Sequence, residues 1–262
     1  MNTHILHKLS YHKVAEMWWL FILACCVCAE KQLQRPRVYL GEEDTNSEFP
    51  YVIGIQDEYG MRICTCSLIA RNWILTAGHC ATFDAPTYVR YDNMTLKLNE
   101  TKAFRRIIEF FQHPNFLYVD TDGTIENDIA LALIQDVPKG RKFGKLSAID
   151  YKALLGYPVR YAGYGYTGDE FSNESDQVKP LQTGDAVVIA CEPEWPRFGP
   201  AICVAPKCSN HLQDTRPGDS GCPLVYRGKI VGVLIGGNSP ISEFLPVSPN
   251  LGWISSIMKR YS

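Results

Sequence analysis

The chain has 262 residues, 46% of them hydrophobic and 21% charged, which is enough for a substantial buried core and excludes disorder as the dominant state. The formal net charge is −2 and Lys and Arg form no long run, which argues against binding of nucleic acid or an anionic membrane through the overall field. Ten cysteines spread along the chain indicate disulfide bonds formed in an oxidising compartment.

The amino-terminal segment is typical of a secretion signal. Met17 to Ala29 is an unbroken apolar run, preceded by lysines, that is too short to span about 30 Å of hydrocarbon. Its small closing residues form an acceptable cleavage site, so we expect residues 1–29 to be removed as a signal peptide. The alternative is a short membrane anchor, and either interpretation places the body of the chain outside the cytosol.

The body of the chain consists of short apolar, β-branched or aromatic stretches separated by turn residues, which is typical of strands. The predicted strands are Tyr51–Ile55, Ser67–Ile69, Trp73–Thr76, Thr87–Tyr91, Phe104–Phe110, Ile129–Ile134, Val159–Tyr164, Ala186–Ala190, Ile202–Ala205, Pro223–Tyr226 and Lys229–Ile235. Only the tail, Leu251 to Tyr261, has helical periodicity. The pattern predicts an all-β fold in two halves, joined near Lys139 to Tyr157, with a C-terminal α-helix.

Three segments carry side chains that could perform acyl transfer. His79 follows a predicted strand, Asp128 begins an apolar strand that would bury its carboxylate, and Ser220 lies in the glycine-flanked turn Gly218-Asp219-Ser220-Gly221. A serine hydroxyl is a poor nucleophile until a base removes its proton, and histidine does so when a buried carboxylate fixes its tautomer. The structural alternatives are a core histidine, a strand-end carboxylate and a turn serine.

Together these segments resemble the secreted serine peptidases of the chymotrypsin/trypsin family, over nearly the whole stretch from Val38 to Tyr261. The same resemblance is carried by the Cys-x-Cys-Ser-Leu-Ile run before His79, the Gly163-Tyr164-Gly165 turn and the Trp253-Ile254 ending. It implies two six-stranded antiparallel β-barrels and a C-terminal α-helix, with the site in the cleft between the barrels. The implied protease domain covers residues 38–262, with an N-terminal barrel at about 38–143, a C-terminal barrel at about 157–250 and the helix at 251–261.

The resemblance assigns His79 as general base and acid, Asp128 as its orienting carboxylate and Ser220 as nucleophile, with the N–H groups of Gly218 and Ser220 as the oxyanion hole. The implied function is a secreted serine endopeptidase that acts through an acyl-enzyme. The strongest alternative is a catalytically silent homologue that serves as a binding or adaptor module. A third interpretation is a toxin or salivary effector with a single protein target, which would differ from the implied endopeptidase in purpose and not in chemistry.

Activation by cleavage is a further implication of the resemblance. Arg37-Val38-Tyr39-Leu40-Gly41 is similar to the family's activation junction, although Leu40 stands where the family has glycine. Cleavage after Arg37 would remove a short propeptide, residues 30–37, and free the amino group of Val38 to pair with Asp219, which orders the oxyanion loop. The alternative is an ordinary basic linker.

The resemblance also assigns most of the remaining cysteines. It implies a Cys64–Cys80 bridge that holds the histidine loop and a Cys191–Cys203 bridge behind the serine. Cys208 is left as a free thiol, an intermolecular partner or an alternative partner of Cys191.

A third bridge is predicted from two further departures from the family pattern. Cys66 and Cys222 both replace residues that are usually glycine, in stretches that pass close together in the family fold. We therefore expect a Cys66–Cys222 disulfide that joins the two barrels, provided that the Cα atoms are about 4.4 to 6.8 Å apart.

Specificity is the least defined property. Asp214 occupies the family's pocket-floor position, where a carboxylate would favour Arg or Lys before the cleaved bond. However, Arg216 replaces a cysteine of the bridge that frames this pocket, and Ile235-Gly236-Gly237 replaces the usual Ser-Trp-Gly. Gly237 is the position implied to receive the substrate backbone. The alternative to a pocket-floor role is that Asp214 is a solvated loop charge. The sequence therefore leaves tryptic, chymotryptic and elastase-like preferences open.

The expected partners are a protein or peptide substrate, an activating protease and, as a further possibility, a protein inhibitor, with no nucleic acid and no membrane after signal removal. Asn-x-Ser/Thr motifs at Asn93, Asn99 and Asn173 are expected N-glycosylation sites. The implied serine endopeptidase needs no cofactor. We expect no metal, because neither His113 nor His211 has a ligand partner at useful spacing.

Overall fold

The structure is a computed structural model that describes residues 41–82, 87–92, 94, 96–119, 124–165, 180–191, 199–207 and 213–261. The chain divides into two compact units, Met1–Arg35 and Pro36–Ser262, and every described residue belongs to the second. The predicted signal peptide, the propeptide and the junction at Arg37 and Val38 lie outside the described residues. No described helix is both long and apolar enough to cross a membrane.

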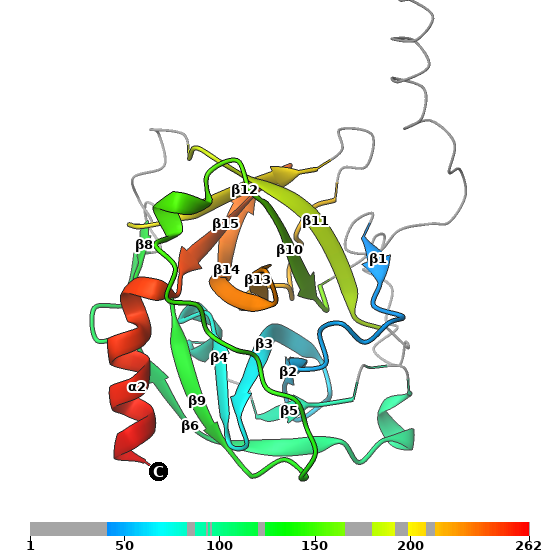
Figure 1. Cartoon of the computed structure of the whole chain (residues 1–262). Helices are drawn as coiled ribbons and strands as arrows, with labels where there is room; N and C mark the ends of the chain where they lie inside the picture. The colour runs from blue at the N-terminus through cyan, green and yellow to red at the C-terminus, as the bar shows by residue number, and fades with distance from the viewer. Residues whose placement is uncertain are drawn as a thin grey trace, which may run out of the picture. The chain divides into compact units, whose positions relative to one another are not determined.

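Six antiparallel strands form a closed barrel in the order β2-β3-β4-β9-β6-β5 (Figure 1). Their bounds are β2 Val52–Gln56, β3 Arg62–Ala70, β4 Trp73–Thr76, β5 Tyr88–Arg90, β6 Phe104–Gln112 and β9 Ala130–Ile134. Branched apolar side chains from several of these strands, among them Ile55, Leu75 and Leu131, are fully buried in the barrel. Their burial is the main source of stability in this half of the molecule.

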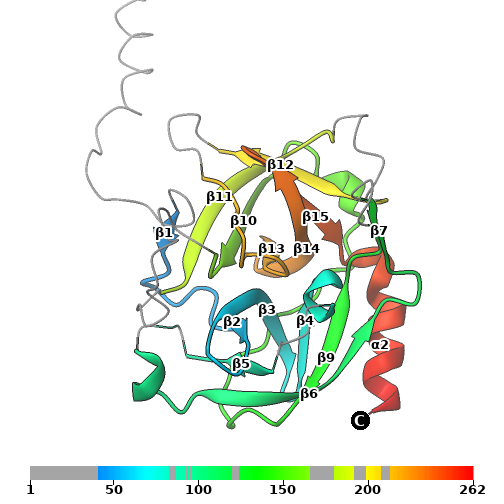
Figure 2. The same ribbon diagram turned by 180° about the vertical axis from the view of Figure 1, so that it is seen from behind.

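A second barrel closes in the order β11-β10-β13-β14-β15-β12, because β12 pairs back with β11 (Figure 2). Its strands are β10 Pro158–Gly163, β11 Gln182–Ile189, β12 Ile202–Pro206, β13 Pro223–Tyr226, β14 Lys229–Asn238 and β15 Ile241–Pro246. Tyr161, Leu224 and Phe244 belong to the hydrophobic cluster inside it. The predicted pair of six-stranded antiparallel barrels is therefore confirmed.

The remaining elements are short, apart from the C-terminal helix α2, Leu251–Arg260, which contributes buried Ile254 to the larger hydrophobic cluster. Strand β1 extends the second barrel's sheet beside β11, and β7 pairs with β8. The short elements are β1 Glu42–Glu43, β7 Leu117–Val119, β8 Thr124–Glu126 and the 3-10 turns η1 His79–Ala81, η2 Leu98–Glu100, η3 Tyr151–Leu154 and η5 Ser248–Asn250.

Each of the predicted strands corresponds to an observed one, and the predicted helix is confirmed. The sequence missed β15, although this strand completes the second barrel. Ser242 and Glu243 are adjacent in it and both are buried, so the alternation of apolar and polar residues that marks a half-buried strand is absent. The other missed strands, β1, β7 and β8, are too short to show such a pattern.

Among the described residues there are two disulfides, Cys64–Cys80 and Cys191–Cys203, and both are those that the family resemblance implies. Cys208 lies outside the described residues.

The predicted Cys66–Cys222 disulfide is wrong, because both cysteines are free and buried. Cys66 packs in one hydrophobic cluster and its thiol donates to the carbonyl of Ile53 at 3.4 Å, whereas Cys222 packs in the separate cluster of the second barrel. The two side chains therefore enter different cores. Burial raises the pKa of both thiols well above the ordinary value, which keeps them protonated and unreactive.

Candidate active site

The first and second barrels touch along β3 and the loop that carries Ser220. The N–H of Thr65 in β3 donates to the carbonyl oxygen of Ser220 at 2.9 Å. Nearby, Arg62 donates to the carbonyl of Tyr164, and the Tyr164 hydroxyl donates to the carbonyl of Val52 at 3.3 Å. The seam between the barrels is thus fixed by hydrogen bonds that join residues far apart in sequence.

His79 and Asp128 meet at one end of the first barrel. The antiparallel register pairs Thr76 at the end of β4 with Ala130 at the start of β9, so the residues just beyond these positions face each other. Asp128 Oδ2 lies 2.6 Å from His79 Nδ1, and Oδ1 accepts from the His79 backbone N–H at 2.6 Å. The carboxylate is fully buried, and the imidazole is 15% exposed.

This double contact fixes the orientation of the imidazole. A buried carboxylate needs hydrogen-bond donors, and here both oxygens have one from the same residue. Because Nδ1 faces the Asp128 carboxylate, the neutral ring carries its proton on Nδ1 and donates it to Asp128. Nε2 is then the nitrogen that can accept a proton. His79 and Asp128, which we expected to act together, are therefore in direct contact.

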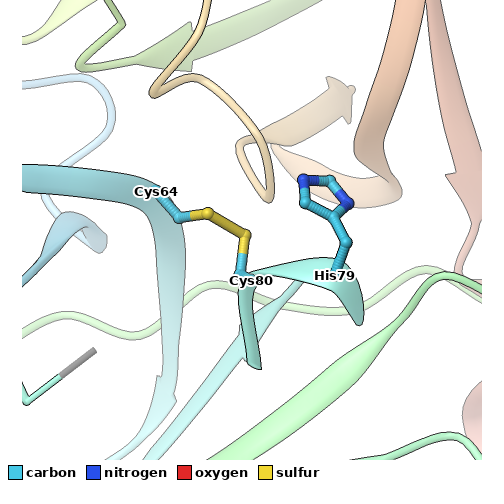
Figure 3. A group of neighbouring side chains, drawn as sticks. All are labelled: Cys64, His79 and Cys80. Atoms are coloured by element: carbon cyan, nitrogen blue, oxygen red, sulfur yellow. A yellow bond between two sulfur atoms is a disulfide. The ribbon is translucent and has the colours of Figure 1, made fainter. Parts of the chain in front are cut away.

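The histidine turn is held in place by the first disulfide. Figure 3 shows the His79 imidazole extending from the same short turn as Cys80, whose sulfur is bonded to Cys64 in β3. One ring nitrogen of His79 and the two cysteine sulfur atoms lie within 4.8 Å of one another. Because both sulfurs are joined in the disulfide, neither is a thiolate that could bind a metal ion.

Ser220 lies beside this turn. The Cys80 sulfur is 3.7 Å from the Ser220 carbonyl oxygen, so the residue that follows His79 contacts the Ser220 backbone directly. Gly218 and Gly221, on either side, have φ angles of +93° and +85°, which side chains other than glycine rarely adopt. The glycines thus permit the sharp turn that presents Ser220.

The peptide groups around Ser220 are held from several directions. Asp219 N–H donates to Arg216 O at 2.9 Å, and Cys222 N–H donates to Asp219 O at 2.8 Å. The Thr65 hydroxyl donates to Gly218 O at 2.9 Å and accepts from the N–H of Tyr164 at 3.1 Å.

Thr65 was missed by sequence reasoning, because a threonine in a strand is ordinary. Its only sequence signal is its place between the two cysteines of the Cys-x-Cys run. Its buried hydroxyl ties the Gly218 carbonyl of the second barrel to the first barrel.

Asp219 is a fully buried carboxylate behind this loop. It accepts from the N–H groups of Gly165 at 2.7 Å and Arg216 at 3.0 Å. Burial raises the pKa of the Asp219 carboxyl to about 6, although these two bonds and the charge of Arg62 favour the ionised form. The site therefore holds a carboxylate whose desolvation is only partly compensated.

Asp214, the expected pocket-floor residue, lies beside Arg216 in the structure. Asp214 is buried, so the alternative of a solvated loop charge is wrong, and the guanidinium Nη2 of Arg216 lies 3.7 Å from its Oδ2. The hydroxyls of Thr215 and Ser242 are 2.9 Å apart and join this loop to β15. Gly237 faces Ser242 across the β14–β15 pair.

Of the expected glycosylation sites, Asn99 is exposed in η2, as a glycan acceptor must be. Asn93 and Asn173 lie outside the described residues, as does His211. His113 packs edge-to-face on Trp253 at 5.2 Å between ring centroids, which is a structural contact.

Two antiparallel barrels with a histidine–carboxylate pair at their seam define a chymotrypsin-like protein. The family model for trypsin matches residues 38–254. The chain therefore belongs to the trypsin family of serine proteases.

Individual relatives are distant. Rat tonin (Rattus norvegicus) is 25% identical over 270 residues, covering 92% of this chain and 99% of tonin. Inactive snake venom serine proteinase 13 of Crotalus adamanteus is also 25% identical, over 75% of this chain and 77% of the relative. The solved structure of neuropsin, a serine protease of mouse brain, superposes with a TM-score of 0.67 at 22% identity, covering 83% of this chain and 98% of neuropsin. The last comparison concerns the fold alone.

Proposed function

We propose that this chain is a secreted serine endopeptidase that hydrolyses peptide bonds through an acyl-enzyme. The observation that carries the proposal is the buried Asp128 carboxylate, both of whose oxygens are engaged by His79. Contact between Cys80 and the backbone of Ser220 adds support, since the loop of Ser220 then lies next to the histidine turn. Membership of the trypsin family supplies the reaction class.

In the proposed mechanism, Nε2 of His79 takes the proton of the Ser220 hydroxyl as its oxygen attacks the scissile carbonyl carbon. Asp128 stabilises the resulting imidazolium. The N–H groups of Gly218 and Ser220 donate to the oxyanion of the tetrahedral intermediate. His79 then protonates the leaving amine, the C–N bond breaks, and a water molecule repeats the sequence on the ester to release the carboxylic acid and restore Ser220.

Activation is proposed to follow cleavage after Arg37, which separates residues 30–37 from the protease domain at 38–262. The new ammonium of Val38 would supply the positive charge that a buried carboxylate requires, and Asp219 is such a carboxylate. Pairing would lower the pKa of Asp219 and keep it ionised at neutral pH. Its bonds to Gly165 and Arg216 would then be strengthened, which orders the oxyanion loop.

Secretion is proposed from the apolar run ahead of the domain and from the two disulfides, which persist in oxidising compartments. The same setting suits N-glycosylation at Asn93, Asn99 and Asn173. A peptide or protein is the proposed substrate, with an activating protease and a protein inhibitor as further partners.

A catalytically silent homologue remains the second candidate, since one relative carries the word inactive in its name. A measurement of peptide hydrolysis distinguishes an active endopeptidase from a silent homologue. The full chain would be cleaved after Arg37 by an arginine-specific peptidase that is then removed, and incubated with a mixed peptide library read by mass spectrometry. We expect cleavage products only with protein whose amino terminus is Val38, and none with Ser220→Ala or with uncleaved Arg37→Gln. A silent homologue would give no products even when fully cleaved.

Thr65→Val is expected to lower kcat about 10- to 100-fold with little change in KM. The substitution leaves the Gly218 carbonyl and the Tyr164 N–H without their buried partner, each at about 1–3 kcal/mol, and loosens the loop that holds the transition state. Thr65→Ser, which keeps the hydroxyl, should restore kcat. If Thr65→Val lowered thermal stability but left kcat unchanged, Thr65 would be structural only and not a positioning residue.

A further inference from the structure

The buried carboxylate of Asp214 already has a cationic neighbour within the chain. The side chain of Asp214 is 5% exposed and that of Arg216 is 39% exposed, with Nη2 of the arginine 3.7 Å from Oδ2 of the aspartate. The carboxylate is therefore enclosed, and Arg216 is the more exposed member of the pair, although its Nε atom is buried. A cation that approached the carboxylate would therefore also come close to the positive charge of Arg216.

The loop that carries this pair is joined to β15 by side-chain hydroxyls. Thr215 lies between Asp214 and Arg216, and its Oγ1 is 2.9 Å from Oγ of Ser242, which is buried. A Cβ atom at Gly237 would overlap the Ile241 carbonyl oxygen and lie 2.8 Å from Ser242 Cα, so β14 and β15 approach closely here. These contacts hold the loop beside β15 and leave the Thr215 and Ser242 hydroxyls already paired.

We infer that Arg216 is a specificity-determining residue, whose guanidinium is the internal counter-ion of Asp214 and excludes substrates with Arg or Lys before the scissile bond. The inference rests on the proposed endopeptidase function and on the expected place of Asp214 at the floor of the substrate pocket. Uncharged side chains are expected at that substrate position instead, because the site then presents a neutralised ion pair and two hydroxyls already bonded to each other.

The physical argument is one of charge balance in a partly desolvated site. Asp214 alone would attract a cation strongly, because its charge is shielded from water. With Arg216 beside it the pair is neutral, and a second cation gains little from the carboxylate while being repelled by the guanidinium. Removing the charge of Arg216 should therefore raise activity toward substrates with Arg or Lys before the scissile bond. Damage to the fold would lower activity, so it could not produce the same result.

The test compares the wild type with Arg216→Met, which keeps an unbranched side chain but removes the charge. Each protein is cleaved after Arg37, and its active fraction is titrated with a fluorophosphonate. Arg260→Met, at the exposed end of α2, is the matched control. Peptide substrates that differ only in the residue before the scissile bond carry Arg, Lys, an apolar residue or Glu.

We expect the wild type to favour the apolar peptide at least about 10-fold in kcat/KM over Arg and Lys, and Arg260→Met to behave identically. Arg216→Met should raise kcat/KM for Arg and Lys at least about 10-fold, since like-charge contacts cost several kcal/mol. Adding Asp214→Asn should abolish the gain. A wild type that prefers Arg, Lys or Glu, or an Arg216→Met profile equal to that of the wild type, would overturn the inference.

Binding of benzamidine, an aromatic cation, gives a readout that does not require catalysis. In the Ser220→Ala background, Arg216→Met should lower the Kd for benzamidine at least about 10-fold relative to the Ser220→Ala protein that keeps Arg216. An unchanged Kd contradicts the role of Arg216. By contrast, if binding improves but no cleaved variant reacts with the fluorophosphonate, the proposed peptidase function fails while the counter-ion role of Arg216 stands.

Discussion

Asp128→Asn is expected to lower kcat by about 10⁴-fold with the fold intact, which is the magnitude found when the orienting carboxylate of a Ser-His-Asp site becomes an amide. The carboxylate accepts from both the backbone N–H and the Nδ1 side of His79. An amide has only one oxygen, so its NH₂ group must face one of these two donors. If it faces the ring, the proton moves to Nε2, which can then no longer act as base.

Steady-state hydrolysis by the cleaved enzyme measures this effect, and Asp136→Asn is the matched control. Asp136 is an exposed carboxylate 3.1 Å from Arg71, where such ion pairs contribute little. We expect the control to retain wild-type kcat. A loss of less than about tenfold in Asp128→Asn would mean that the His79–Asp128 contact holds the fold together without taking part in catalysis.

Gly221→Ala is expected to destabilise the protein by about 4 kcal/mol and to abolish activity. Gly221 has φ of +85°, which costs an alanine about 1 kcal/mol or more. In addition, the new methyl group would overlap the Thr76 hydroxyl and the Thr65 carbonyl oxygen and lie 3.0 Å from Ala77 N. Two of these three atoms belong to the backbone, so the Ser220 turn must move away from the first barrel.

Gly140→Ala separates the cost of the positive φ angle from the cost of steric overlap. Gly140 has a similar φ of +89°, but a Cβ atom there meets nothing within 4 Å. Chemical denaturation should show a loss of only about 1 kcal/mol for this control, with full activity. Equal losses in the two variants would show that backbone conformation alone requires Gly221 and that the barrels do not pack tightly at Ser220.

The sequence predicted those parts of the site that lie in short contiguous motifs. His79 could be found because it follows a strand and precedes a cysteine, and Asp128 because a carboxylate at the start of an apolar strand is buried with it. Strand register then brings the two together, since β4 and β9 pair in the barrel. Their contact is the consequence of a topology that the family resemblance implied.

Residues that act across the seam could not be predicted in this way. Nothing in the strand pattern marks the Thr65 hydroxyl as a partner of Gly218, because the partner belongs to the other barrel. The Cys66–Cys222 prediction failed for a related reason. Proximity of two chain segments does not fix which way their side chains point, and here each thiol enters the core of a different cluster.

Covalent labelling shows most directly whether Ser220 is the nucleophile. The full chain, cleaved after Arg37, would be treated with a fluorophosphonate, and the modified peptide identified by mass spectrometry. We expect a single adduct on Ser220 that requires His79 and is absent from Ser220→Ala. Protein with Val38 as its proven amino terminus that forms no adduct, or forms one on a different residue, would contradict it.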